Sequence, residues 1–463
     1  MTKTVGASIL AAGKGTRLNF DCPKPLLPAL GLKLIDYPVL ALKNFYKNNG
    51  LSGEITAVTG FEKEQVESYL GESYPDIKFA LQKEQLGTAD ALKSYFKGNS
   101  NAKDFDYTIV ICADTPLISE VEISSLYKEA ISKNLDAVVA SFEAINPTGY
   151  GRIVRSNPGF HIVEEKDASD EIKKITEVNS GFYLIKTKYI LENLNNIDTN
   201  NKSGEFYLTD LFKDNLNVAP MKFDNESIFM GVNTLAQLSK ANFALRKIKN
   251  IQLMNEGVYI VDPNHTQIDW NVEIESNVTI HQNCSLYGST KVSSGTQIMQ
   301  GCVIENSFIG KNSTIKPYSH IESSKIGNSS SIGPFAHLRP GSEIGDSCKI
   351  GNFVETKKSK LENNVSVSHL SYVGDAEVGS NVNIGCGFIT CNYDGANKHK
   401  TIIGPGSFIG SDTQMIAPIN IGKESYIASG STINKDVPDG AFAIARGKQV
   451  TKEDMAKRFI KKK

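Results

Sequence analysis

The sequence predicts a protein of two domains, in which an α/β domain is followed by a parallel β-helix. Three observations support this prediction. Apolar runs alternate with helix-like stretches up to about residue 232, an aliphatic residue recurs every six positions from Ile268 onward, and a stretch without proline or glycine separates these two patterns. A chain of 463 residues has enough length for two to three domains of about 150 residues each.

The first pattern is an alternation of strands and helices. Helix-like stretches include Gln65–Leu70 and Val121–Ser132. Apolar runs of strand length lie at Val5–Leu10, Ile55–Thr59, Tyr107–Ile111, Ala137–Ser141 and Phe182–Ile185. Such an alternation is typical of an α/β domain with a mostly parallel sheet.

The stretch from Leu235 to Met254 contains neither proline nor glycine and is predicted to be a connecting helix. Its apolar residues at helical spacing are Leu235, Leu238, Ala241, Leu245 and Ile248. We therefore expect a first domain over residues 1–233, a linker helix over residues 234–256, and a β-helix domain with its C-terminal tail over residues 257–463.

The second pattern is a six-residue period with occasional one-residue slips. The repeated positions are Ile268, Ile274, Ile280, Leu286, Val292, Ile298, Ile304, Ile309, Ile315, Ile321, Ile326, Ile332, Leu338, Ile344, Ile350, Leu361, Val367, Val373, Val378, Ile384, Ile403, Ile409, Met415, Ile421, Ile427 and Ile433. A helical period of 3.6 residues cannot produce this series, whereas a hexapeptide repeat is typical of a parallel β-helix. The aliphatic residue would point inward, and glycine, asparagine and serine would turn the corners because they tolerate the corner dihedrals.

The six-residue period is interrupted twice. Between Ile350 and Leu361 it breaks at residues 355–358, and between Ile384 and Ile403 residues 390–398 are expected to leave the coil as a loop. Loops at such breaks commonly line the working face of a repeat protein.

Composition excludes several classes of function. With 50 Lys and Arg against 51 Asp and Glu, the chain has no overall field that would attract nucleic acid or an anionic membrane. No run approaches the roughly 18 apolar residues of a membrane helix, and the opening apolar run does not lead to a signal-peptide cleavage site. Seven cysteines without a C-x-x-C pair, and seven histidines without close metal-ligand spacing, argue against a disulfide framework and a zinc site. We expect a soluble, cytoplasmic protein.

A turn rich in small residues follows the first predicted strand directly, at residues 10–17. Small residues allow the backbone to approach a phosphate, whose oxygens the N–H groups can bind. Arg17 and Lys24 add positive charge suited to a reacting triphosphate. The turn matches neither a Walker A loop nor a dinucleotide fingerprint, so its meaning depends on the motifs that follow it.

Those motifs resemble the signature of sugar-1-phosphate nucleotidyltransferases. In chain order they are Pro23–Pro25, Gln82–Thr88, Ala113–Leu117, Gly149–Arg152, Val163–Ala168, Glu177–Gly181 and Gly231–Asn233. With the β-helix behind them, nearly the whole chain is similar to the family of bifunctional N-acetylglucosamine-1-phosphate uridyltransferase/glucosamine-1-phosphate acetyltransferase enzymes. The resemblance implies a Rossmann-like, mostly parallel mixed sheet, a left-handed parallel β-helix, and a homotrimer assembled through that β-helix. It also implies a role in supplying bacterial cell-wall precursors.

The resemblance assigns one set of residues to uridylyl transfer from UTP. Asp114 and Asn233 would hold a Mg²⁺ ion, and Lys24 would contact the phosphates. The residues implied to bind the nucleotide are Leu10, Ala11, Ala12, Gly13, Arg17, Gln82, Gly87 and Thr88. Those implied to bind the N-acetylglucosamine moiety are Gly151, Glu164 and Asn179. Attack of a sugar phosphate on the α-phosphate of UTP brings several negative charges together, so a metal and cations are needed but no protein nucleophile is.

A second set is assigned to acetyl transfer from acetyl-CoA. His369 would be the general base, because an amine must lose its proton before it can attack a thioester. The positions implied to bind glucosamine-1-phosphate are Arg339, Lys357, Tyr372, Asn383 and Lys398. Those implied along the acetyl-CoA path are Cys386, Asn392, Tyr393, Ser411, Ser429 and Arg446.

Two cysteines depart from the family pattern, because Cys112 stands where the family usually has tyrosine and Cys386 where it more often has alanine. Two alternative functions remain open. The β-helix could be only a structural and oligomerising platform behind a nucleotidyltransferase, or the chain could be a binding or regulatory protein whose first site has decayed. His369 with the loop at Asn392–Tyr393 argues against the first alternative, and Lys24, Asp114 and Asn233 together argue against the second.

Overall fold

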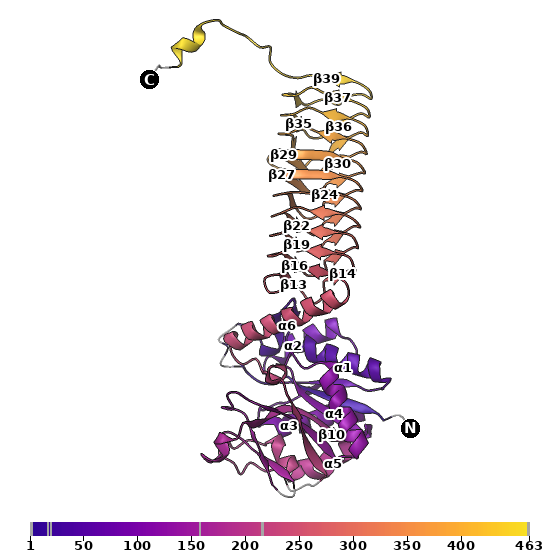
Figure 1. Ribbon diagram of the computed structural model, residues 1–463. Helices are drawn as coiled ribbons and strands as arrows, with labels where there is room; N and C mark the ends of the chain where they lie inside the picture. Colours follow the sequence, from indigo (N-terminus) through magenta and orange to yellow (C-terminus); the bar gives the residue numbers. More distant parts are fainter. Residues whose placement is uncertain (1–2, 16–17, 19–20, 157–158, 214–216, 461–463) are drawn as a thin grey trace. The chain divides into compact units, whose positions relative to one another are not determined.

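The computed structural model describes residues 3–15, 18, 21–156, 159–213 and 217–460 (Figure 1). The chain divides into two compact units between Leu245 and Arg246. Each unit is described by itself below.

The first unit is built on a mixed sheet whose main path runs β11-β7-β10-β6-β1-β4-β5. All neighbours on this path are parallel except β10, which is antiparallel to β6 and β7. The strands are β1 (Val5–Leu10), β4 (Ile55–Thr59), β5 (Lys78–Leu81), β6 (Tyr107–Cys112), β7 (Ala137–Glu143), β10 (Glu177–Lys186) and β11 (Val218–Phe223). The predicted α/β class and mostly parallel sheet are confirmed.

Helices cover both faces of this sheet because its strands are apolar on both sides. In β6, Ile109 and Ile111 pack into one core and Val110 into another. The first core includes residues of α1 (Asp36–Asn49), α2 (Lys63–Ser73) and α4 (Glu120–Lys133). The second includes residues of α3 (Thr88–Gly98) and α5 (Thr187–Asn193). Helix α4 begins at a capping box, in which Ser119 and Glu122 satisfy each other's backbone N–H groups.

Two short antiparallel pairs complete the first unit. Strands β2 (Pro28–Ala29) and β3 (Leu32–Lys33) pair with each other. Strands β8 (Arg152–Arg155) and β9 (Phe160–Val163) form a second pair, in which Arg152 lies opposite Val163. Gly151 and Glu164 therefore lie at the same end of this pair.

Helix α6 spans Leu235–Asn255, and the boundary between the two compact units falls within it. Among the residues expected to form its apolar face, Ala241 and Leu245 are buried, whereas Leu235 and Ile248 are nearly half exposed. The apolar face is thus narrower than the spacing predicts.

The second unit is a left-handed parallel β-helix whose strands form three parallel ladders (Figure 1). The first ladder contains β12 (Tyr259–Ile260), β15 (Thr279–Ile280), β18 (Gln297–Ile298), β21 (Thr314–Ile315), β24 (Ser331–Ile332), β31 (Asn383–Ile384), β34 (Phe408–Ile409), β37 (Tyr426–Ile427) and β39 (Phe442–Ala443). The second contains β13 (Gln267–Ile268), β16 (Ser285–Tyr287), β19 (Val303–Glu305), β22 (His320–Glu322), β25 (His337–Leu338), β32 (Ile389–Cys391), β35 (Gln414–Ile416) and β38 (Thr432–Ile433). The third contains β14 (Glu273–Ile274), β17 (Lys291–Val292), β20 (Phe308–Ile309), β23 (Lys325–Ile326), β26 (Glu343–Ile344), β28 (Lys360–Leu361), β30 (Ala376–Val378), β33 (Thr401–Ile403) and β36 (Ile419–Ile421).

Strands β27 (Lys349–Lys357) and β29 (Ser366–Gly374) are longer than the other strands of the second unit, and each takes part in both the first and the second ladder. They pair with each other over almost their whole length.

The predicted inward positions are confirmed, because every residue of the six-residue series is buried. Many corners are turned by asparagine in the left-handed region, for example Asn277, Asn312 and Asn381 at φ of 62°, 55° and 59°. The period therefore corresponds to one face of the coil per six residues.

The two predicted interruptions are wrong in part. Residues 355–357 do not break the coil, because they belong to β27 and Thr356 is a fully buried inward residue opposite Leu338 and Val373. Thr390 is likewise inward and buried within β32, so the excursion begins at Asn392 rather than at residue 390. Threonine is tolerated inside because each hydroxyl is hydrogen-bonded. Thr356 Oγ1 bonds to Ser342 Oγ at 2.8 Å, and Thr390 Oγ1 accepts from Gly374 N at 2.8 Å.

In the described part of the chain, no helix combines the length and the apolar character needed to cross a membrane. The seven cysteines are all free thiols, in agreement with the expected lack of a disulfide framework.

Candidate functional sites

The small-residue turn lies at the carboxyl end of β1, between two neighbouring strand ends. Ala11 N donates to Val58 O of β4 at 2.9 Å, and Ala113 N, just beyond β6, donates to Leu10 O at 3.0 Å. A Cβ added at Gly13 would meet nothing within 4 Å, so there is open space beside this backbone. Ligands of open α/β sheets bind at such carboxyl ends. Arg17, the other predicted cation of this turn, lies outside the described residues.

Three side chains far apart in sequence meet beyond the end of β6. Lys24 Nζ forms an ion pair with Asp114 Oδ2 and donates to Asn233 Oδ1 at 2.8 Å. The backbone holds this arrangement, because Val232 N donates to Asp114 O at 2.9 Å and Asn233 N donates to Gln237 Oε1 at 2.8 Å. The structure therefore brings the predicted metal ligands and the predicted phosphate lysine into direct contact.

The segment expected to contact the uracil of the nucleotide also forms a compact cluster. Gln82 is buried and its Nε2 donates to Gly87 O at 3.1 Å and to Asp90 Oδ2 at 2.8 Å. Gly87 has φ of 123°, and a Cβ there would lie 2.5 Å from Phe206 O, so only glycine fits. Thr88 begins α3 and its Oγ1 accepts from Leu208 N at 3.1 Å. With its amide N–H groups engaged in this way, Gln82 is held in one orientation.

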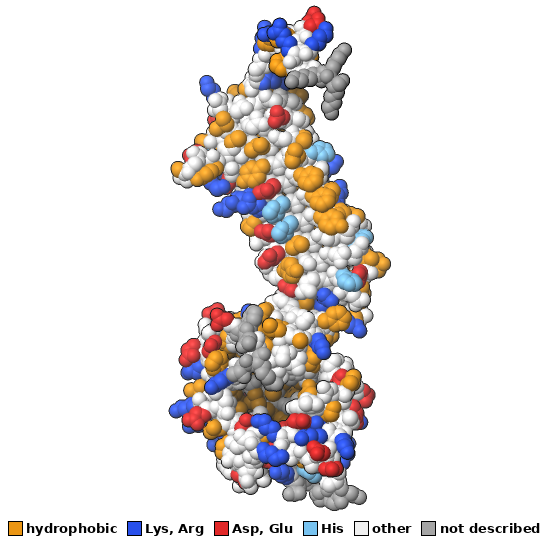
Figure 2. Space-filling view, turned by 90° about the vertical axis from the view of Figure 1, so that its left-hand side faces the viewer, with side chains coloured by type: hydrophobic (Ala, Val, Ile, Leu, Met, Phe, Trp, Pro, Cys, Tyr) orange, Lys and Arg blue, Asp and Glu red, His pale blue; other side chains and the backbone are white. Residues whose placement is uncertain are grey.

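The residues expected around the sugar form a third cluster. Asn179 N donates to Gly151 O at 2.8 Å, and a Cβ on Gly151 would lie 3.3 Å from Glu164 Oε2. Burial raises the pKa of the Glu164 carboxyl, while a hydrogen bond from Thr209 Oγ1 at 3.0 Å partly opposes this shift. Figure 2 shows a hollow in this unit, apolar inside and rimmed by charged side chains.

Cys112, which departs from the family pattern, is the last residue of β6. Burial raises the pKa of its thiol to about 12, so the side chain is a neutral thiol at physiological pH. It therefore adds no charge beside Asp114.

The candidate base of the β-helix lies on β29 opposite Asn352 of β27. Asn352 Oδ1 lies 2.9 Å from His369 Nδ1. Because an amide oxygen can only accept, Nδ1 carries a hydrogen, and in the neutral ring the lone pair then belongs to Nε2. His369 is exposed, so this lone pair is available to a substrate.

His369 shares one column of the coil with three of the residues expected along the acetyl-CoA path. The registers Val367↔Ile384, Ile384↔Ile409 and Ile409↔Ile427 continue two residues further. That column, which we call the base column, consists of Asn352, His369, Cys386, Ser411 and Ser429. Arg446 reaches its far end, where its guanidinium donates to Ser429 O at 2.8 Å. Asn383 lies at the start of the neighbouring strand, β31.

Three of the five residues expected to bind the sugar phosphate lie on the second ladder, whereas Asn383 is on the first ladder and Lys398 is on the loop after β32. The register Leu338↔Thr356 places Arg339 beside Lys357, and Lys357 lies opposite Gly374. The hydroxyl of Tyr372 folds back over Gly374, where a Cβ would lie only 2.3 Å from it. Arg339 donates to Glu355 Oε1 at 2.8 Å, and this hydrogen bond raises the pKa of its guanidinium. Two cations and a hydroxyl therefore converge, as a phosphate requires.

The excursion after β32 is an ordered hairpin-like loop. Asn392 Nδ2 donates to Asp375 Oδ2 at 2.5 Å, and Tyr393 and Lys398 form an antiparallel bridge with the ammonium 5.6 Å from the ring. Hydrogen bonds from the backbone N–H of Asn397, the ring of His399 and the backbone N–H of Ala396 hold the pKa of Asp394 well below its usual range. These contacts all lie within the chain and link the loop to the coil at Asp375.

Within one chain these residues form two groups that a corner separates. The corner column consists of Tyr318, Phe335, Phe353 and Leu370, all at positive φ and all roughly half exposed. The base column lies on one side of it and the Arg339–Lys357–Tyr372 group on the other. The structure does not bring His369 and Arg339 together within one chain.

Comparisons with known proteins give the two units their family. Residues 7–228 match the family model described as nucleotidyl transferase, and residues 323–358 match bacterial transferase hexapeptide (six repeats). The chain is 41% identical over 455 residues to the bifunctional protein GlmU of Geotalea uraniireducens, covering 97% of this chain and 98% of that protein. The GlmU proteins of Clostridioides difficile and Staphylococcus haemolyticus are 41% and 40% identical, covering 96% and 98% of this chain and 96% and 99% of their own.

The chain belongs to the bifunctional GlmU family. It is therefore an enzyme with uridyltransferase and acetyltransferase activities, as its resemblance implied. A binding protein with a decayed first site is excluded as a description of this chain.

Several positioning residues of this family member escaped sequence reasoning. Thr209 bonds Glu164, Tyr183 accepts from Asn179 at 2.7 Å, and Asn352 bonds His369. For Asn352 a signal existed, because it precedes His369 by 17 residues, close to three six-residue faces, and thus lies one coil below it. Thr209 carries no such signal, since only the tertiary fold brings it to Glu164. Tyr183 lies four residues after Asn179 on β10, across an irregularity of the strand that the sequence does not mark.

Proposed function

We propose that the two reactions of this enzyme of UDP-N-acetylglucosamine synthesis take place separately, one in each unit. The β-helix would acetylate glucosamine-1-phosphate from acetyl-CoA, and the α/β unit would then transfer uridylyl from UTP to N-acetylglucosamine-1-phosphate and release pyrophosphate. The observation that carries this proposal is that each unit brings together its own predicted residues, Lys24 with Asp114 and Asn233 in one unit and His369 with the base column in the other.

In uridylyl transfer, the chain's own residues would position two anionic substrates. The turn at Leu10–Gly13 would receive the triphosphate, Gln82 would present its fixed amide to the uracil, and Glu164 with Asn179 would hydrogen-bond the acetamido sugar. Lys24 would leave Asp114 for the phosphates once these are bound, because its charge is better matched by a polyphosphate.

The donor set at Asp114 and Asn233 fits a Mg²⁺ ion. A carboxylate oxygen and an amide oxygen point at a single ammonium nitrogen, so one cation already lies between two hard oxygen donors. Mg²⁺ is typically bound by one or two such side chains together with substrate phosphates and water. When bound, the ion would neutralise charge on the reacting phosphates.

In acetyl transfer, His369 Nε2 would take a proton from the amine of glucosamine-1-phosphate. The amine nitrogen would then bond to the thioester carbonyl carbon, and the carbon–sulfur bond would break to release CoA. Arg339, Lys357 and Tyr372 would bind the phosphate, while Asn392 and Tyr393 would meet the thioester. The acetyl-CoA would extend along Cys386, Ser411, Ser429 and Arg446.

We further propose a homotrimer, in which one chain's base column faces a neighbour's phosphate-binding group. The corner column supports this proposal. The rings of Tyr318, Phe335 and Phe353 stack at 5.4 Å spacing and expose about half of their surface. Bulky residues at positive φ are strained, and a neighbouring copy that buries these rings would offset that cost. Figure 2 shows apolar side chains gathered along one edge of the coils.

The remaining proposals concern domain bounds and location. Helix α6 at Leu235–Asn255 and the first coil strand at Tyr259 support a catalytic domain over residues 1–233, a linker over 234–256 and a β-helix domain over 257–463. The near balance of charge supports a cytoplasmic enzyme without a nucleic-acid partner or membrane insertion.

The test is a single assay of the purified full chain with glucosamine-1-phosphate, acetyl-CoA, UTP and Mg²⁺, in which free thiol and pyrophosphate are followed separately. Asp114→Asn should abolish pyrophosphate release from supplied N-acetylglucosamine-1-phosphate and leave thiol release unchanged. His369→Gln should lower thiol release by about 10²- to 10⁴-fold and spare uridylyl transfer. His281→Gln, which changes an imidazole elsewhere on the coil, is the matched control.

Two outcomes would overturn the proposal. Loss of both activities in either folded variant would mean that the two sites are not separate. Pyrophosphate release without any thiol from the wild-type chain would mean that the β-helix is only a platform.

A further inference from the structure

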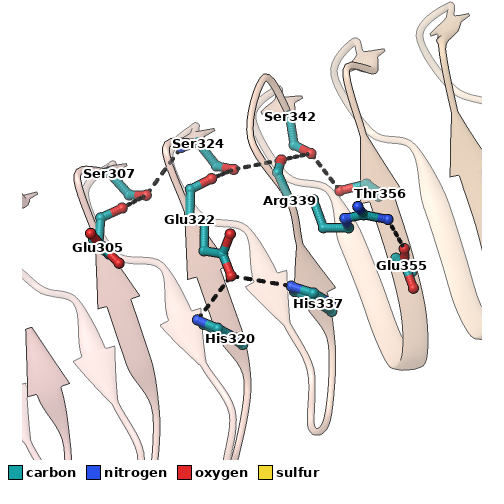
Figure 3. A network of polar contacts seen from close by, with 10 residues as sticks. All are labelled: Glu305, Ser307, His320, Glu322, Ser324, His337, Arg339, Ser342, Glu355 and Thr356. Atoms are coloured by element: carbon teal, nitrogen blue, oxygen red, sulfur yellow. Dashed lines mark hydrogen bonds and ion pairs between the residues drawn. The ribbon is translucent and has the colours of Figure 1, made fainter.

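Two histidines that are far apart in sequence lie against each other on the second ladder. His320 of β22 is directly opposite His337 of β25. Their rings stack with centroids 5.1 Å apart and planes within 6° of parallel (Figure 3). The histidines have no close metal-ligand spacing in the sequence, yet these two are neighbours in the fold because the 17 residues that separate them make one coil.

A carboxylate faces both rings. Glu322 Oε1 lies 3.2 Å from His320 Nε2 and 3.5 Å from His337 Nε2 (Figure 3). The potential ligand atoms of the three residues all lie within 4.8 Å of one another. His337 Nε2 is inaccessible to solvent and makes no hydrogen bond among the described residues. A buried nitrogen without such a partner is costly, so this atom is suited to a ligand that the chain itself does not supply.

We propose that His320, His337 and Glu322 form a binding site for a divalent transition-metal ion, with Zn²⁺ as the best match. Two imidazole nitrogens and one carboxylate oxygen are ligands that Zn²⁺ accepts, whereas Mg²⁺ and Ca²⁺ prefer oxygen alone. Because the two rings are nearly parallel, their in-plane lone pairs do not yet point at one position, and metal–ligand bonds of about 2.0–2.2 Å require the imidazole side chains to rotate. The fourth position would remain open to water.

The backbone around the cluster is fixed, so binding needs only side-chain rotation. His320 N donates to Ala336 O at 2.9 Å in the ladder, and Glu322 O accepts from Ser324 Oγ at 2.6 Å. The three side chains expose between 32% and 44% of their surface, which leaves a path for an ion to enter.

The cluster lies beside the group expected to bind the sugar phosphate, because Arg339 follows His337 by two residues on the same coil. Arg339 directs its guanidinium to Glu355 at 2.8 Å and not to Glu322 (Figure 3). Glu355 is therefore the hydrogen-bond partner of Arg339, while the charge of Glu322 makes a smaller contribution to the raised pKa of the guanidinium. The inference does not depend on the proposed catalytic roles.

The experiment is a titration of tag-free, chelator-treated full-length protein with Co²⁺, in excess Mg²⁺ to occupy oxygen-donor sites. We expect one tightly bound Co²⁺ per chain, visible d–d absorption typical of imidazole ligands, and displacement by Zn²⁺. Affinity should fall as the pH is lowered, because protons compete for the imidazole nitrogens. His320→Gln, His337→Gln and Glu322→Gln should each weaken binding by at least about 100-fold, since even changes outside the direct ligands cost about 10- to 100-fold.

His265→Gln is the matched control, because His265 pairs with Asp262 at 2.7 Å but has no second histidine beside it. This variant should bind Co²⁺ like the wild type. Unchanged binding in the three cluster variants, an equal loss in His265→Gln, or no binding in excess Mg²⁺ by the wild type would each overturn the proposal.

Discussion

A single methyl group at Gly374 should damage acetyl transfer without unfolding the protein. A Cβ at this position would lie 2.3 Å from the hydroxyl oxygen of Tyr372 and 2.5 Å from the ring carbon that carries it. Ordinary contact begins at 3.4 Å, so the hydroxyl must move by about 1.1 Å. The obstacle is the end of a side chain rather than backbone, so the ring can swing away at small cost in stability.

That displacement falls where Tyr372 is proposed to contact the sugar phosphate beside Lys357. A misplacement of about 1 Å in a substrate-positioning group can cost about 100-fold in rate. We therefore expect kcat/KM of Gly374→Ala for glucosamine-1-phosphate to fall by about 10- to 100-fold, with an unchanged melting temperature and normal uridylyl transfer. Steady-state kinetics of thiol release and of pyrophosphate release measure the two activities.

The Tyr372→Ala background provides the control. Without the ring, the added methyl group has nothing to displace, so Gly374→Ala should cause no further loss there. Wild-type kinetics in the single variant would refute the reasoning, and so would an equal loss in both backgrounds.

Two further predictions concern buried polar groups. Thr390→Val should destabilise the β-helix by about 1–3 kcal/mol, because Gly374 N–H loses its acceptor. Thr356→Val should cost less, since its partner Ser342 still donates to Arg339 O at 2.7 Å. Calorimetry of both variants checks this order, and equal losses of stability would contradict it. Glu164→Gln should raise the melting temperature at neutral pH, because burial raises the pKa of Glu164 and its charge opposes folding above that pKa. This gain should vanish as the pH falls toward the usual range of a carboxyl group, while affinity for N-acetylglucosamine-1-phosphate is lost at neutral pH. A gain that persists in acid would show that charge is not its cause.

The coil could be predicted from the sequence because its period is local. For each aliphatic residue of the series, from Ile268 to Ile433, its place in the six-residue period is enough to predict that it points inward. Thr356 and Thr390 are inward as well, but they cannot be recognised from the period because they are polar. These two hydroxyls are hydrogen-bonded inside the coil, so a polar residue there is no sign that the chain leaves it.

The candidate sites could be predicted only where a family motif marks them. Lys24, Asp114 and Asn233 come from three motifs, yet their mutual contact depends on a fold that brings together residues up to 209 positions apart. His320 and His337 belong to no motif, and their separation of 17 residues hides the fact that they are neighbours. Counting in coils rather than in residues would have placed them side by side.

This difference in the sequence separation of contacting residues has a consequence for folding during synthesis on the ribosome. The uridylyl site cannot form until Asn233 has emerged from the ribosome, because Lys24 and Asp114 need this partner from near the end of their unit. The β-helix instead completes each layer against the layer made just before it, and the pair of Asn352 and His369 needs only 17 more residues of chain. Nascent chains stalled at successive lengths should therefore gain the first site in one step, and the coil should grow layer by layer as the chain emerges.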